Sequence, residues 1–398
     1  MRVVHISDLH LGFRQYQRLT PSGINQREAD VAGSVLRAVT QIIRLAPDLI
    51  VVGGDVFHSV RPSNPAILHA FRAFSALREQ LPETPIVMVA GNHDAPRTTE
   101  TGCILRLFRE IGVHVADAKA ELFTFPSRAL AVLAVPDVPG IDRPPLTPPE
   151  GFEHTVLVMH GEIAGVLPAH AASADRAAIE IPVTELHADA WSYIALGHYH
   201  VYREIAPRAY YSGSVDYTSS NPWGELREER EQGVPGKGFI EHNLVTGAHR
   251  FHPVPPSRPL VDLEPIDASG MGAAEVNAAL RVRVNSAPGG IDDRVVRASV
   301  YNVPRHIVHD LDHDALREYR KRAMNFHLDT RPPEPLVRQR TGEGAPGRRA
   351  TLPEILAERL QARPLPPGIE RLQLKTLGLR YLQQAEDAAA AAVPVSDH

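Results

Sequence analysis

The chain contains five short, strongly apolar runs, and each is followed at once by polar side chains. The runs cover residues 3–6, 49–52, 86–90, 156–159 and 193–196. β-Branched residues are prominent in them and apolar and polar residues do not alternate, so they predict strands that are buried on both faces. Stretches with apolar residues at helical spacing, at residues 28–46 and 65–81, separate the first three runs. The pattern predicts an α/β fold.

Composition narrows the kind of protein. A length of 398 residues suggests two or three domains. The net charge is −5, from 42 basic and 47 acidic residues, so the protein as a whole does not attract nucleic acid by a positive field. A polyanion would have to bind at a local basic patch or at a bound metal. Cys103 is the only cysteine, which excludes intrachain disulfides and Cys-rich metal sites. We expect its thiol to be buried and the protein to be cytoplasmic. We expect neither export nor membrane insertion, because we find no signal-like or membrane-spanning apolar stretch.

The sequence changes character beyond residue 200. Short segments separated by turns at residues 210–254 predict a second, antiparallel sheet, and a Pro-rich hinge then precedes a strand–helix–strand–helix–strand pattern. A stretch rich in Pro, Gly and Arg follows, and Thr351 is a candidate N-cap for the first of two amphipathic helices. We expect a first domain at residues 1–255, a small α/β domain at 256–331, a flexible linker at 332–350, a helical segment at 351–388 and a disordered tail at 389–398.

The polar residues after the apolar runs are typical metal ligands. They are Asp8, His10, Asp55, Asn92, His160, His198 and His200. Ligands bind outside the carboxyl ends of strands in α/β sheets, so side chains from five strand ends can converge on one site. Carboxylate, imidazole and amide groups suit Mn²⁺, Fe²⁺ or Zn²⁺. Seven candidates are too many for one ion, so we expect two metals, with Asp55 as the bridging carboxylate.

Such a site suits phosphate-ester hydrolysis. Two divalent ions would outweigh the charges of Asp8 and Asp55, so a phosphodiester could bind while an acidified water attacks phosphorus. His93 lies next to Asn92 and is a candidate proton donor to the leaving oxygen. His58 is a candidate phosphate contact or supporting residue, and Asp94 is either part of the catalytic group or a capping residue.

Taken singly, each motif has a structural interpretation. The Asp-Leu-His near the N-terminus is more often a loop with a helix cap than a metal site, and Gly-Asn-His-Asp suits a strand-to-helix turn. Five such clusters in order, each after a predicted buried strand, favour a real site. We expect the remaining histidines, including His5 and His114, to be structural.

The motifs D-x-H, G-D, G-N-H-D, H and G-H-x-H resemble those of the calcineurin-like metallophosphoesterase superfamily. The segments DLHLG, GDVFH, GNHD, GHYH, YSGSVDYTSS and GKGF are more similar still to the SbcD exonucleases, the nuclease subunits of a bacterial double-strand-break repair complex. The resemblance implies a four-layer α/β/β/α sandwich with a small α/β cap domain and C-terminal helices. It also implies a Mn²⁺-dependent DNA nuclease with 3′–5′ exonuclease and endonuclease activity in DNA repair and recombination.

The resemblance assigns roles to individual residues. One metal would be held by Asp8, His10, Asp55 and His200, and the other by Asp55, Asn92, His160 and His198. His93 becomes the catalytic histidine and His58 a second active-site histidine. The chain departs from the commoner pattern at His58, where many bacterial relatives have Asp, and after His160, where Gly161 and Glu162 follow.

The resemblance also implies partners. The cap domain would help to bind DNA, and the terminal helices would dock on an SbcC-like coiled-coil ATPase, while a homodimer stays open and no membrane is involved. Two other functions are compatible with the same residues. One is a metallophosphatase or phosphodiesterase acting on a substrate other than DNA, and the other is a non-catalytic scaffold that recruits a DNA-processing ATPase.

Overall fold

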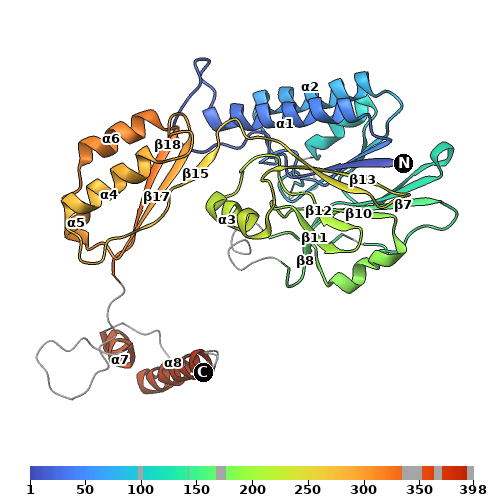
Figure 1. The fold of residues 1–398 in the computed structure, drawn as a ribbon. Helices are drawn as coiled ribbons and strands as arrows, with labels where there is room; N and C mark the ends of the chain where they lie inside the picture. Colours follow the sequence, from blue (N-terminus) through green and yellow to red (C-terminus); the bar gives the residue numbers. More distant parts are fainter. Residues whose placement is uncertain (97–101, 142, 167–175, 334–351, 363–369, 392–398) are drawn as a thin grey trace, which may run out of the picture. The chain divides into compact units, whose positions relative to one another are not determined.

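The structure is a computed structural model that describes all residues except 97–101, 142, 167–175, 334–351, 363–369 and 392–398. It divides into two compact units, Met1–Pro333 and Glu334–His398. The first unit contains two six-stranded sheets and a smaller four-stranded sheet. This is the mixed α/β architecture that the sequence predicts (Figure 1).

The first six-stranded sheet has the strand order β14-β13-β1-β2-β3-β4. Its strands are β1 (Arg2–Ile6), β2 (Leu49–Val52), β3 (Ile86–Val89), β4 (His114–Ala116), β13 (Gly238–Asn243) and β14 (His249–Pro253). Strands β1 to β4 are parallel, as the first three apolar runs predict. Helices α1 (Gln26–Leu45) and α2 (Asn64–Gln80) pack on one face of this sheet through Val31, Val35 and Phe74.

The second six-stranded sheet has the order β11-β12-β10-β7-β6-β5. Its strands are β5 (Glu121–Phe125), β6 (Leu130–Val135), β7 (His154–His160), β10 (Tyr193–Gly197), β11 (Arg203–Ala206) and β12 (Ala209–Tyr211). Strands β6, β7, β10 and β12 run parallel, while the edge strands β5 and β11 are antiparallel to their neighbours. Two of the five predicted strands, β7 and β10, therefore belong to this sheet.

The two sheets pack face to face. Val51 and Val87 of the first sheet share a buried cluster with Val132 and Val158 of the second. The other face of the second sheet is covered by a layer that includes Trp191 and the 3₁₀ helices Val183–Leu186 and Ala188–Ala190, with the short pair β8 (Glu162–Ile163) and β9 (Glu180–Ile181) nearby. Together with α1 and α2, this gives the expected four layers.

The expectation of a separate antiparallel sheet at residues 210–254 is wrong. Strands β13 and β14 form an antiparallel hairpin, but β13 pairs with the edge of β1 and extends the first sheet. Strand β12 instead joins the second sheet beside β10. The reason is that one edge of β1 is free to pair, and a strand distant in the sequence pairs with it. Strand propensity alone does not predict which strands pair. In the sequence, helix α3 (Pro222–Gln232) lies between β12 and β13.

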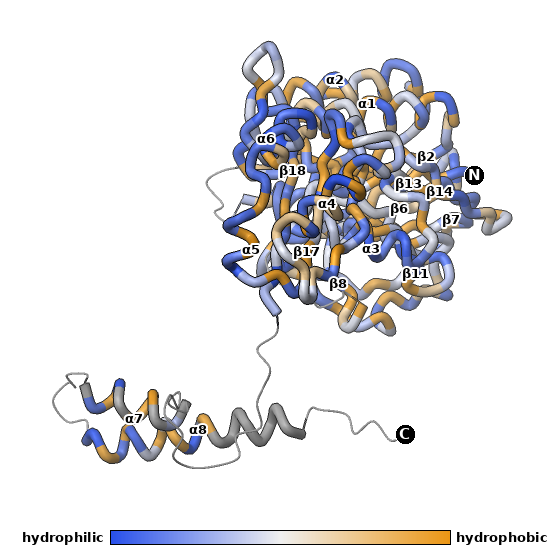
Figure 2. The backbone as a smooth tube through the Cα atoms, turned by 60° about the vertical axis from the view of Figure 1, so that its left-hand side comes forward, coloured by the Kyte–Doolittle hydropathy of each residue, from blue (hydrophilic) through white to orange (hydrophobic). Residues whose placement is uncertain are grey.

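The small sheet begins after the Pro-rich segment. It consists of β15 (Leu260–Asp262), β16 (Ile266–Asp267), β17 (Val295–Tyr301) and β18 (Asn325–Thr330), all parallel to the central β17. Helices α4 (Ala273–Asn285), α5 (Arg305–His309) and α6 (His313–Arg322) accompany it. These elements share their own buried cluster, which includes Val276, Val296 and Leu316. The tube of α6 is mostly hydrophilic, in keeping with a single buried face (Figure 2).

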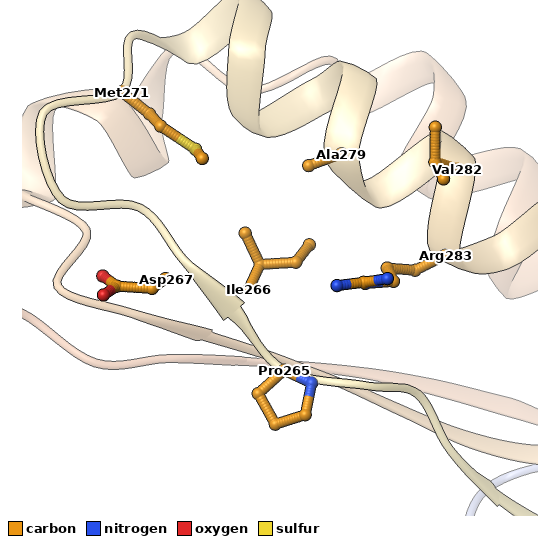
Figure 3. Close-up of a pocket in the computed structure, with 7 residues that line it drawn as sticks. All are labelled: Pro265, Ile266, Asp267, Met271, Ala279, Val282 and Arg283. Atoms are coloured by element: carbon orange, nitrogen blue, oxygen red, sulfur yellow. The ribbon is translucent and has the colours of Figure 1, made fainter.

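An open pocket of about 390 Å³ lies on this small α/β region, between β16 and α4. Its lining residues are Pro265, Ile266, Asp267, Met271, Ala279, Val282 and Arg283 (Figure 3). None of the seven candidate metal ligands lines it. The pocket is therefore distinct from the predicted metal site.

The second unit contains two helices, α7 (Leu352–Ala362) and α8 (Arg371–Ala391), as predicted. They pack on each other where Gly378 meets Leu356, while Leu372 and Tyr381 are exposed within this unit. The predicted cap at Thr351 and nearly all of the predicted linker lie outside the described residues, as does the predicted tail beyond residue 391. No helix in the described part of the chain combines the length and apolar composition that a bilayer span requires.

Candidate metal centre

The predicted ligands lie where strands from both six-stranded sheets end. The loops after β1, β2 and β3 come from the first sheet, and those after β7 and β10 come from the second. The sheets approach closely at Gly53 and Gly197, since a Cβ atom on Gly197 would lie 1.8 Å from the Gly53 carbonyl oxygen. Glycine at position 197 thus allows the two sets of loops to share one site.

Four candidate ligands have left-handed backbone conformations. The φ angles are 53° at Asp8, 44° at His10, 50° at Asp55 and 107° at His198. Such conformations are uncommon outside glycine and cost of the order of 1–3 kcal/mol each. Backbone hydrogen bonds hold the first two loops together, because the His10 N–H donates to the Asp55 carbonyl at 2.9 Å. The backbone is therefore organised to aim these side chains before any ligand binds.

Asp8, His10 and His200 form the first group of donors. The Nε2 atoms of His10 and His200 lie 3.0 Å apart, and the His200 Nε2 atom is 4.0 Å from Asp8 Oδ1. The donor atoms of all three lie within 4.8 Å of one another. Asp8 is held in place because both of its oxygens accept from the His198 backbone N–H, at 3.1 and 3.2 Å.

Asp55, His160 and His198 form the second group, again with donor atoms within 4.8 Å. Asn92 belongs with them, because its Oδ1 atom lies 3.0 Å from His160 Nε2 and 3.3 Å from His198 Nδ1. His160 directs Nε2 into the site since its Nδ1–H donates to the Gly53 carbonyl at 2.8 Å. The structure thus brings together all seven predicted ligands, in the two sets that the resemblance implies.

Asp55 lies between the two groups. Its Oδ2 atom is 3.7 Å from His10 Nε2 and 3.5 Å from His160 Nε2. Burial opposes ionisation of this carboxyl, but His160 and His93 outweigh that effect and hold the pKa of Asp55 below its usual value. An ionised carboxylate at this position can serve both groups.

These donors fit divalent cations. The facing Nε2 atoms of His10 and His200 cannot hydrogen-bond to each other if both are unprotonated, whereas a cation would satisfy both lone pairs. Burial and the neighbouring histidine His200 lower the pKa of His10 well below its usual value, which favours the neutral form that binds metal. Two carboxylates, four imidazoles and an amide oxygen without thiolate suit Mn²⁺, Fe²⁺ or Zn²⁺.

His93 and His58 lie beside the first group. The His93 N–H donates to Asp55 Oδ1 at 3.0 Å, and its Nδ1 atom is 2.9 Å from the His58 carbonyl. The His58 and His93 rings stack with centroids 5.2 Å apart, and His58 Nδ1 lies 3.4 Å from His10 Nδ1. Both predicted catalytic histidines therefore border the donor groups.

Asp94 lies beneath the loop after β2. It accepts hydrogen bonds from the backbone N–H groups of Phe57, Val56 and Gly91, at 2.9, 3.1 and 3.1 Å. Burial and the nearby Asp55 raise the pKa of Asp94 to about 8, although the three N–H groups oppose this shift. These contacts indicate that Asp94 holds the loop in place and does not contact the substrate.

Three buried charged residues near the site are absent from the predicted set. Glu162 contacts His198, Glu225 faces His200, and Lys237 contacts the His200 carbonyl. The sequence offers a signal for Glu162, which lies two residues after His160, and a weaker one for Lys237, which lies in the GKGF segment. Glu225 falls in a charged helix and carries no local signal of its own.

Comparisons with known proteins agree with this site. The profile of the family described as Calcineurin-like phosphoesterase matches residues 1–230. The chain is 26% identical over 257 residues to the DNA double-strand break repair protein Mre11 of Methanococcus maripaludis, covering 61% of this chain and 63% of the relative. Identity to the same-named protein of Methanocaldococcus jannaschii is 26% over 255 residues, covering 60% and 61%.

A longer alignment reaches into the distal part of the chain. The protein of the same name from Methanosarcina mazei is 24% identical over 362 residues, which cover 80% of this chain and 55% of the relative. In each of these alignments the chain spans less than two thirds of the relative's length. The family match covers more than half of the chain and contains every candidate ligand. The chain therefore belongs to the calcineurin-like phosphoesterase family.

Proposed function

We propose that this chain is a metal-dependent DNA nuclease of the SbcD type, which hydrolyses phosphodiesters in DNA repair. The observation that carries the proposal is that Asp55 of the second donor group also faces the first, because its Oδ2 atom lies 3.7 Å from His10 Nε2 and 3.5 Å from His160 Nε2. Paired metal sites of this kind are used for phosphate-ester hydrolysis. The relatives named for DNA double-strand break repair support DNA as the substrate.

The proposed ligand sets follow the two donor groups. One metal would be held by Asp8, His10, Asp55 and His200, and the other by Asp55, Asn92, His160 and His198. When bound, two divalent ions, for which we propose Mn²⁺, would supply positive charge to a phosphodiester and acidify a water. The chain's own contribution is to hold these ligands on fixed backbone loops inside a buried site.

His93 is the proposed proton donor. Its Nδ1 atom faces the His58 carbonyl at 2.9 Å, so we assign the contact with a leaving oxygen to the other ring nitrogen, Nε2. The His93 backbone N–H also donates to Asp55, so the ring is positioned relative to this carboxylate. His58 stacks on His93 and would orient it. Asp94 would act indirectly, through the loop that carries Asp55.

The distal parts have proposed roles as well. We propose a nuclease domain at residues 1–255, a DNA-binding cap at 256–331, a linker at 332–350 and an ATPase-binding segment at 351–388. The exposed Leu372 and Tyr381 of α8 support the last assignment, because an apolar surface on this helical pair favours a protein partner. An SbcC-like coiled-coil ATPase is the proposed partner.

Digestion assays test the proposal. The purified full chain, freed of metal and supplied with Mn²⁺, is given labelled DNA, bis-p-nitrophenyl phosphate or a phosphomonoester, beside a His93→Ala control. We expect metal-dependent cleavage of DNA and of the diester, and a large loss of both in the control. Preferential hydrolysis of the monoester would favour a phosphatase. Lack of hydrolysis of every substrate, together with binding of the ATPase, would favour a scaffold.

A further inference from the structure

The two histidines of the Gly-His-Tyr-His loop are each faced by a buried carboxylate, on opposite ring nitrogens. His198 Nε2 lies 3.1 Å from Glu162 Oε1, while its Nδ1 atom faces Asn92 in the second donor group. The same Glu162 oxygen accepts from the Ala177 backbone N–H at 3.0 Å. Glu162 is therefore placed to accept a hydrogen bond from the ring atom that points away from the metal donors.

The arrangement at His200 is reversed. His200 Nδ1 lies 3.4 Å from Glu225 Oε1, while its Nε2 atom faces His10 and Asp8 in the first donor group. His200 Nδ1 and Glu225 Oε1 are both buried, and neither forms a closer hydrogen bond within the described residues. A proton on Nδ1 would satisfy both atoms.

Glu225 is itself held by a buried lysine. Lys237 Nζ lies 2.5 Å from Glu225 Oε2, 2.9 Å from Glu229 Oε1 and 2.7 Å from the His200 carbonyl oxygen. The ammonium thus binds both the carboxylate and the backbone of the histidine that this carboxylate faces. Because Lys237 occupies Oε2, the other oxygen of Glu225 is directed at the ring.

We propose that Glu162 and Glu225 are positioning residues that impose opposite tautomers on His198 and His200. Glu162 keeps the His198 proton on Nε2 so that Nδ1 serves as the metal donor, and Glu225 keeps the His200 proton on Nδ1 so that Nε2 serves. The metal part of this inference rests on the proposed function, but the tautomers are a property of the metal-free chain. Partners of this kind change metal affinity by about 10- to 100-fold when removed.

The same isosteric substitution should act differently at the two positions. In Glu162→Gln the Ala177 N–H still requires an acceptor, so the amide oxygen stays in place and His198 keeps its proton on Nε2. In Glu225→Gln the Lys237 ammonium takes the amide oxygen, so the amide NH₂ is turned to His200 Nδ1. That group donates, and the His200 proton moves to Nε2, where it blocks the metal lone pair.

Nitrogen-15 NMR on histidine-labelled, metal-free full chain tests the inference at alkaline pH, where the rings are neutral. Signals of His198 and His200 are assigned with His198→Gln and His200→Gln variants. We expect Nε2–H at His198 and Nδ1–H at His200 in the unaltered chain. We expect only Glu225→Gln to change the tautomer of its histidine. The same tautomer at both histidines of the unaltered chain, or no change in Glu225→Gln, would overturn the proposal.

A Mn²⁺ titration gives the second measurement. We expect Glu225→Gln to weaken binding at one site about 10- to 100-fold and Glu162→Gln to weaken it less. Glu231→Gln, on the exposed side of the same helix as Glu225, is the matched control and should leave binding unchanged. Equal losses in both Gln variants would contradict the proposal. The predicted tautomers in a chain that binds no Mn²⁺ would instead refute the proposed metal function while leaving the tautomer assignment intact.

Discussion

The Asp55 carboxylate lies 3.7 Å from His10 Nε2 because a backbone hydrogen bond joins the loops of these two residues, which follow different strands. The same oxygen lies 3.5 Å from His160, the last residue of β7 in the other sheet. One side chain thus links donors from both halves of the sandwich. If both groups bind cations, this geometry places Asp55 within reach of each of them.

Removal of the His93 ring should impair chemistry and spare metal binding. His93→Ala keeps the backbone N–H that donates to Asp55, so two Mn²⁺ should stay bound while the nuclease rate falls about 100-fold or more. Elemental analysis and a DNA cleavage assay measure the two effects. His313→Ala, on an exposed turn of α6, is the control and should match the unaltered chain. Loss of metal from a folded His93→Ala variant would contradict the assignment.

The metal-free protein should lose stability in acid. His5, His242 and His249 lie between the two large sheets, where burial lowers their pKa values to about 3, 4 and 4. Unfolded histidine titrates near 6.5, so below that pH the unfolded chain binds more protons than the native one. The contribution of these three neutral histidines to the free energy of unfolding should be complete above about pH 6.5 and should be lost progressively as the pH falls to about 3.

A single substitution isolates part of this pH dependence. His242 stacks on Tyr193 with centroids 4.6 Å apart, and a His242→Phe substitution can preserve that stacking while removing a titratable group. Urea unfolding in the presence of a chelator should therefore show a shallower loss of stability in acid for His242→Phe. An unchanged slope would show that His242 is not held neutral in the native state.

Arg27 should be important for stability although it is not a candidate ligand. Its guanidinium is buried, donates to Asp216 Oδ1 at 2.8 Å and to the Tyr217 carbonyl at 2.9 Å. Arg27→Met leaves Asp216 buried without its cation, so the free energy of unfolding should fall by about 3–5 kcal/mol. Lys321→Met, which breaks an exposed pair with Glu318, should cost less than about 1 kcal/mol. A similarly small loss of unfolding free energy in both variants would show that the pair of Arg27 and Asp216 contributes little to stability.

Truncation after Pro333 should separate catalysis from partner binding. All seven candidate ligands lie in the unit Met1–Pro333, so this chain should bind Mn²⁺ and cleave short DNA like the full chain. It should lose association with an SbcC-like ATPase in a pull-down. Full-length chain with Leu372→Glu and Tyr381→Glu, both at exposed positions, should lose the same association. Misfolding or loss of basal cleavage on truncation would assign the helices to the core of this chain.

Much of the site could be predicted from the sequence because each ligand lies at or just after the end of a buried strand. Local apolar runs identified β1, β2, β3, β7 and β10, and the strand ends carry the ligands. The division of these strands between two sheets was not predicted, since an apolar run indicates burial without its pairing partner. Strand β13 joins β1 across more than 200 residues, a contact that no local pattern contains.

The supporting residues were harder to predict for the same reason. Glu225 and Lys237 act on His200 through contacts that depend on where α3 and β13 pack. In the sequence, Glu225 is one of several acidic residues in a hydrophilic helix. Its burial, which gives it a role, arises only in the folded chain. Motifs therefore identify ligands better than the groups that orient them.

Electron paramagnetic resonance of the Mn²⁺-loaded full chain tests whether Asp55 bridges a pair of metals. We expect two Mn²⁺ per chain and the signal of an exchange-coupled pair. We expect Asp55→Ala to abolish the coupling and lower the occupancy of at least one site, because two cations would then lie close together without the shared carboxylate. A single Mn²⁺ per chain, two uncoupled ions, or a coupled pair that survives in Asp55→Ala would show that Asp55 does not bridge two metals.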